Sequence, residues 1–129
     1  MALTDITTGT TLQQTYVVET MQLADKVGSG LLPVLATPAL IAWMENTAMQ
    51  AVAPFLTSAE TTVGISIAIT HLKASPLNAT ITCHAMITEV DGRRIRFEVN
   101  AYDADQHLIG EGTHERFVVD RERFMAKLS

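Results

Sequence analysis

Three residues of this 129-residue chain have side chains that together could transfer an acyl group to water: Thr37, Glu45 and His71. A threonine hydroxyl can act as a nucleophile or position a water molecule, and a histidine can accept and return a proton near neutral pH. A carboxylate can orient that histidine or activate the water. Whether the three side chains meet depends on the elements that position them.

Thr37 and Glu45 belong to a segment whose pattern predicts one long helix. Thr37-Pro38 is typical of a helix start, because threonine is a good cap and proline at the first helical position loses no hydrogen bond. We expect the helix to end near Pro54. Its apolar stripe, with spacings of three and four residues, is formed by Leu40, Met44, Ala48, Ala51 and Phe55.

Thr37 and Glu45 each have both a structural and a functional interpretation. Thr37 is either the helix cap or a hydroxyl at a helix N-terminus that attracts anions and carbonyl oxygens, and both can hold. Glu45 lies at the flank of the apolar stripe, away from the polar face with Asn46 and Gln50. A carboxylate there costs free energy unless it is paired. It either reaches the surface or orients a histidine or activates water.

His71 ends a predicted strand with strict alternation. The apolar face of this strand is formed by Val63, Ile65, Ile67 and Ile69. His71 shares that face, where a single histidine is commonly a satisfied core residue. The glutamate on the facing helix favours a Glu–His pair instead. Gly64, on the same strand, is either a bulge or a point where a ligand approaches the backbone.

The last strand carries His114 and Arg116 on one face. Arg116 either pairs with Glu98 or Glu115 as ordinary surface charge or binds a phosphate. The four histidines show no HxH or HxxxH spacing, so we expect no metal site. The sequence has no GxGxxG, P-loop or GxSxG motif.

The remaining pattern predicts an α+β fold. β-branched and alternating residues indicate about five strands, at residues 11–20, 63–71, 81–87, 95–101 and 108–119. Asp91-Gly92 predicts a hairpin between two of them. We expect a loop over residues 24–33, a turn over 103–107 and a short helix over 121–128. An antiparallel sheet wrapped around the one long helix accounts for this order.

Composition limits the class of protein. Hydrophobic residues make up 47% of the chain and charged residues only 18%, so we expect another subunit to cover some apolar surface. The net charge of −5 argues against binding of nucleic acid. The single cysteine, Cys83, permits no internal disulfide, so a reducing, cytoplasmic setting is the default. We expect neither a signal peptide nor a membrane span.

Four segments resemble the hot-dog-fold acyl-CoA thioesterases of the fluoroacetyl-CoA thioesterase type: ATPALIAWMENTA (36–48), VGISIAITHLKASP (63–76), EVDGRR (89–94) and IGEGTHERFVVD (109–120). They follow the family's order, and the resemblance runs from about residue 12 to 120. It implies a hot-dog fold, with a curved antiparallel sheet around one long helix, as a single domain over residues 1–129.

The resemblance also implies an activity, which is hydrolysis of a short acyl-CoA thioester to the free acid and CoA, without a cofactor. Thr37, Glu45 and His71 match the family's catalytic residues, with Thr37 as nucleophile or as positioner of water. Gly64 and Arg116 match residues that bind the substrate. The family forms homodimers by joining two sheets edge to edge, with the acyl-CoA sites at the interface. We therefore expect a homodimer, with a dimer of dimers as the alternative.

One segment departs from the family. Residues 26–35 contain no phenylalanine, whereas the fluoroacetyl enzyme has aromatic residues there as a lid. We therefore expect a different or broader acyl group. Two other functions are alternatives: a non-catalytic module that binds acyl-CoA or a small apolar acid, and a hot-dog dehydratase or hydratase. The three candidate catalytic residues argue against the first, and the Thr-Pro helix start argues against the second.

Overall fold

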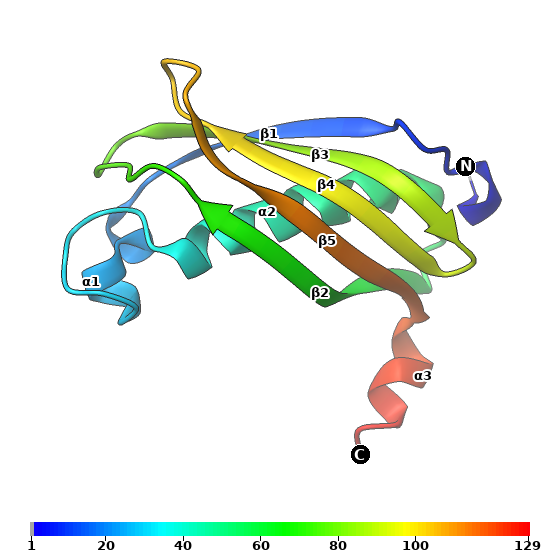
Figure 1. The fold of residues 1–129 in the computed structure, drawn as a ribbon. Helices are drawn as coiled ribbons and strands as arrows, with labels where there is room; N and C mark the ends of the chain where they lie inside the picture. Colours follow the sequence, from blue (N-terminus) through cyan, green and yellow to red (C-terminus); the bar gives the residue numbers. More distant parts are fainter. Residues whose placement is uncertain (1) are drawn as a thin grey trace.

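The computed structural model describes residues 2–129 and has one long helix packed on a single antiparallel sheet (Figure 1). The strands are β1 (Thr11–Val17), β2 (Glu60–His71), β3 (Thr80–Asp91), β4 (Arg94–Tyr102) and β5 (Leu108–Asp120). The α-helices are α1 (Ala24–Val27), α2 (Thr37–Val52) and α3 (Arg121–Ala126). The strand order is β1-β3-β4-β5-β2, so β1 and β2 are the edges. The predicted fold class is confirmed.

The long helix α2 begins and ends close to the predicted positions, but its first turn differs. Ala36 is the N-cap residue, and no side chain caps the helix. The predicted capping role of Thr37 is therefore wrong, because Thr37 is the first helical residue and its hydroxyl lies against His71 instead. The short 3-10 helix Ala53–Phe55 follows the helix, at the predicted Pro54 break.

The core lies between α2 and the central strands. The predicted alternation in β3 and β4 is confirmed, since one residue in two is fully buried: Ile81, Cys83, Ala85, Ile87, Ile95, Phe97, Val99 and Ala101. Leu40 and Met44 of α2 are also fully buried. Gly110 of β5 lets the helix approach closely, because a Cβ atom there would lie 2.9 Å from Leu40 Cδ2.

Strand β2 does not follow the predicted alternation throughout. Its pairing with β5 shifts between Gly64 and Ser66, which inserts one residue as a bulge. Before the bulge Thr62 is buried, and Ile65 is 51% exposed. The prediction that Val63 and Ile65 share a face with His71 is therefore wrong, because one extra residue exchanges the two faces of a strand.

Several local predictions hold with adjusted boundaries. The hairpin at Asp91-Gly92 is confirmed, with Gly92 at φ 61°. The C-terminal helix α3 is capped by Asp120, which accepts a hydrogen bond from the Arg123 N–H at 3.0 Å. The predicted loop over 24–33 contains the four-residue helix α1. Within residues 2–129, no helix is long and apolar enough to cross a membrane.

Candidate active site

Thr37 and His71 meet at the seam between α2 and the end of β2. The Thr37 hydroxyl oxygen lies 2.8 Å from His71 Nδ1. Both residues line a pocket of about 310 Å³, together with residues from α1, the following loop and the segment after β2: Ala24, Ser29, Val34, Leu35, Ala36, Leu72, Lys73 and Ala74. The free N–H groups and the positive dipole end of α2 therefore face the same pocket as the hydroxyl and the imidazole.

The His71 ring is suited to accept a proton. Burial lowers its pKa and outweighs an interaction with the backbone of Lys73 that acts in the opposite sense. The imidazole is thus neutral at pH 7, the state in which one nitrogen carries a free lone pair. Its Nε2 atom is buried and has no hydrogen-bond partner within residues 2–129. A buried polar atom without a partner is unfavourable, and a substrate atom in the pocket would relieve this cost.

Glu45 lies in a different place on the same helix. Eight residues separate it from Thr37, which is roughly 12 Å along an α-helix. Its Oε2 atom lies 3.6 Å from Arg116 Nη1. Within the described part of one protomer, the predicted pair between Glu45 and His71 is not formed, and the ion-pair partner of Glu45 is Arg116.

Gly64 provides the room for the Glu45 carboxylate. A Cβ atom at Gly64 would lie 2.9 Å from Glu45 Oε2, a contact that folded proteins essentially never show. Glu45 and Gly64 line a second pocket, of about 230 Å³, with Ser66, Ile67 and His114. The bulge that was one alternative for Gly64 is confirmed, and the approach of a ligand to its backbone stays a prediction.

Arg116 is buried rather than part of the surface, with 6% of its area exposed. Its Nε and Nη2 atoms donate to the hydroxyl and the carbonyl oxygens of Thr62, at 2.8 and 3.0 Å. It pairs with neither of the acidic residues considered from the sequence, since Glu115 binds Arg94 at 3.3 Å. Its neighbour His114 is fully buried, and sequence reasoning gave that residue no role.

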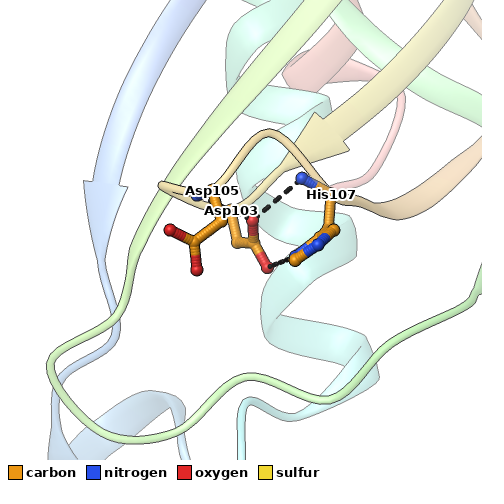
Figure 2. Close-up of side chains that lie close together, drawn as sticks. All are labelled: Asp103, Asp105 and His107. Atoms are coloured by element: carbon orange, nitrogen blue, oxygen red, sulfur yellow. Dashed lines mark hydrogen bonds and ion pairs between the residues drawn. The ribbon is translucent and has the colours of Figure 1, made fainter.

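A third polar group occupies the turn between β4 and β5 (Figure 2). Oxygen and nitrogen atoms of Asp103, Asp105 and His107 lie within 4.8 Å of one another, which is metal-ligand spacing. The Asp103 carboxylate already accepts bonds from Lys73 Nζ at 2.6 Å and from the His107 N–H at 2.9 Å. The Lys73 ammonium lowers the pKa of Asp103 far below its usual range. We interpret the group as structural, because Lys73 connects this turn to the segment that follows His71.

Comparisons with known proteins show what the chain is similar to. A family model described as "FlK: Fluoroacetyl-CoA-specific thioesterase" matches residues 17–122. A fluoroacetyl-CoA thioesterase from Streptantibioticus cattleyicolor is 40% identical over 95 residues, which are 74% of this chain and 68% of that protein.

Two solved structures are also similar. One is a threonine-to-serine variant of the fluoroacetyl-CoA thioesterase FlK in complex with acetyl-CoA, with a TM-score of 0.90, 31% identity, and coverage of 95% of this chain and 96% of that one. The other is a hot-dog-like protein from Thermanaerovibrio acidaminovorans, with a TM-score of 0.84, 20% identity, and coverage of 94% and 89%. The second likeness concerns the fold alone.

Proposed function

The chain belongs to the fluoroacetyl-CoA-specific thioesterase family and is an acyl-CoA thioesterase, and we propose that it cleaves its substrate in the Thr37–His71 pocket. The observation that carries this proposal is the 2.8 Å contact between the Thr37 hydroxyl and His71 Nδ1 inside the pocket. A nucleophile within hydrogen-bond distance of a neutral base is the arrangement that acyl transfer requires.

In the proposed reaction, His71 Nδ1 takes the hydroxyl proton while Thr37 Oγ1 attacks the thioester carbonyl carbon. The carbon–sulfur bond then breaks, and the CoA sulfur leaves with the proton that His71 returns. Water, activated by the same imidazole, hydrolyses the acyl-threonine ester and releases the acid. The N-terminus of α2 stabilises the oxyanion that forms in each step. Water and the protein's own side chains supply every atom, so we propose that no cofactor takes part.

We propose further that the complete site contains Glu45 of the partner subunit in a homodimer. Strand β2 is an edge strand of twelve residues, and an exposed edge of that length is a template for pairing. Two β2 strands paired antiparallel about an axis through Ala68, with the bulged Ile65 left out of the pairing as it is toward β5, place His71 opposite the partner's Gly64. Residues directly opposite share one face of a sheet, so the partner's Glu45 then lies beside His71.

The pocket supports a small acyl group. Val34, Leu35 and Leu72 give it aliphatic walls, and the loop over residues 28–36 adds no aromatic ring. We propose a short acyl-CoA substrate with a broader range than fluoroacetyl-CoA. We also propose a cytoplasmic location, which the single cysteine supports, because Cys83 has no second cysteine in the sequence with which to form an internal disulfide.

A thiol-release assay on a panel of short acyl-CoAs tests the activity. We expect CoA release from at least one of them, and an acyl adduct on Thr37 by rapid quench and mass spectrometry. CoA binding without release would favour a binding module, and hydration of an enoyl-CoA would favour a hydratase. CoA release with no adduct would instead show that Thr37 positions water.

Subunit complementation tests the shared site. Thr37→Ala and Glu45→Gln chains are each expected to be inactive alone. When they are mixed and reassembled, half of the dimers carry one intact site, so about a quarter of wild-type activity is expected to return. No recovery would mean that Thr37 and Glu45 act within one chain.

A further inference from the structure

Behind Glu45, the buried ring of His114 links the β2 bulge to Arg116. His114 lies on β5 with 1% of its area exposed and stacks on Phe97, with ring centroids 5.9 Å apart. Its Nδ1 atom lies 2.8 Å from the Ser66 carbonyl oxygen. Its Nε2 atom lies 3.2 Å from Arg116 Nη1.

These two contacts allow only one protonation state of the ring. A carbonyl oxygen can only accept, so Nδ1 must carry the proton that it donates to Ser66. A guanidinium nitrogen can only donate, so Nε2 must present its lone pair to Arg116. The ring is therefore the neutral Nδ1–H tautomer. Burial, with a smaller contribution from the charge of Arg116, lowers the pKa of His114 and agrees with this state.

Arg116 is fixed in turn on both sides. Thr62 accepts from its Nε and Nη2 atoms, and His114 accepts from Nη1. Held in this plane, Nη1 lies 3.6 Å from Glu45 Oε2. Glu45, His114 and Arg116 gather around the space left by Gly64, since a Cβ atom there would be 2.9 Å from Glu45 Oε2, 3.4 Å from His114 Cε1 and 3.5 Å from Arg116 Nη1.

We propose that His114 is a positioning residue for the thioesterase reaction, which orients Arg116 and through it the Glu45 carboxylate. This inference rests on the proposed function, because Glu45 has a role only in a catalytic site. His114 itself does not contact the Thr37–His71 pocket. Its effect is on the placement of a charged group, and a displacement of a catalytic group by about 1 Å can cost roughly 10²-fold in rate.

Two substitutions separate the two bonds of the ring. His114→Gln can place an amide oxygen near Nε2, which keeps the acceptor for Arg116 and loses the donor to Ser66. His114→Asn can place an amide nitrogen near Nδ1, which keeps the donor and loses the acceptor. We expect His114→Asn to lower kcat by roughly 10- to 100-fold with little change in KM, and His114→Gln to retain most of the kcat.

Equal losses in the two variants, or no loss in His114→Asn, would overturn the proposal. Thr62→Val is the second variant, because it removes the hydroxyl that accepts from Arg116 Nε and leaves the carbonyl of residue 62 and the ring in place. This variant is also expected to lower kcat with little change in KM. An unchanged kcat would contradict the proposal that Arg116 orients the Glu45 carboxylate. Melting temperatures of all three variants separate these effects from unfolding.

The tautomer has its own test, which does not depend on activity. Nitrogen-15 NMR of the wild-type histidine rings distinguishes a protonated Nδ1 from a protonated Nε2, and His114→Gln assigns the signal. We expect the Nδ1–H form, and an Nε2–H or doubly protonated ring at pH 7 would overturn the proposal. A wild type that releases no CoA from any acyl-CoA would contradict the proposed function instead.

Discussion

The Thr37–His71 pocket and the Glu45–Arg116–His114 group are built in opposite ways. In the pocket, Thr37 is exposed and His71 keeps a buried Nε2 atom without a partner within residues 2–129. Around Arg116, each guanidinium nitrogen has a partner, and both ring nitrogens of His114 are bonded. Unsatisfied polar atoms beside a cavity are ready to bind a reacting molecule, whereas a satisfied network holds its members in one geometry.

The difference indicates which group reacts and which positions. Loss of a group that completes the site, Glu45 included, should abolish chemistry, whereas loss of a group that only positions Glu45 should weaken it by displacement. The contrast can be tested in four steps, which run from the largest expected effect to the smallest.

The pocket predicts the largest loss. Thr37→Ala and His71→Ala are each expected to lower kcat by roughly 10²-fold or more, because each removes a member of one nucleophile–base pair. The double variant should be little worse than either single variant, since residues that act as a unit are not additive. CoA release under saturating substrate measures this. His84→Ala, on the opposite face of the sheet, is the control with expected wild-type activity, and full activity in His71→Ala would contradict the role of the pocket.

The positioning group predicts a smaller loss at Gly64. A methyl group in Gly64→Ala would meet Glu45 Oε2 at 2.9 Å, so the carboxylate has to move. We expect kcat to fall by about tenfold. Glu45→Ala and Glu45→Ala/Gly64→Ala should then have the same activity, because the added methyl has no carboxylate left to displace. A further loss in the double variant would show that Gly64 acts by another route, such as its own N–H group.

Much of this arrangement was predictable from the sequence. The Thr-Pro start and the apolar spacing located α2, and alternation located the buried faces of β3 and β4. The alternation also placed His71 on the face toward the helix, and the contact with Thr37 confirms this placement. The resemblance to fluoroacetyl-CoA thioesterases is confirmed as well, by the family model over residues 17–122.

The remaining features depend on contacts that a local sequence pattern does not contain. A helical wheel gives the side of the helix on which Glu45 lies but not its height along the axis, and roughly 12 Å of rise separates Glu45 from Thr37. An alternating pattern does not reveal an inserted residue. The bulge therefore puts Val63 and Ile65 on a different face from the one that the alternation predicts. Arg116 alternates with charged neighbours like a surface residue, and its burial depends on Thr62, which lies 54 positions away in sequence.

The pH dependence of the reaction reports the protonation state of His71 in the pocket. Catalysis requires neutral His71, whose pKa is lowered by burial from 6.5. The midpoint of the acid limb of kcat/KM should therefore lie below pH 6.5, and the value should fall below that midpoint by at most about tenfold per pH unit. An NMR titration of the His71 ring should show the same midpoint. An acid limb with a midpoint above 6.5 would mean that another group controls the rate.

The smallest effect is on stability, and it comes from the positioning group. Burial lowers the pKa of His114 from 6.5 in the folded protein, so the unfolded chain binds a proton first as the pH falls. The free energy of unfolding contributed by this residue is therefore constant above the unfolded pKa and is lost as the pH falls below it, through the folded pKa. In His114→Gln this loss is absent, so the drop in melting temperature between pH 7.5 and 5.5 should be smaller than in wild type, by a few degrees at most. Thermal unfolding of both proteins at each pH measures the difference. If the two proteins lose the same number of degrees, the pKa of His114 is the same in the folded and the unfolded protein, and this would contradict a neutral ring held by Arg116 in the fold.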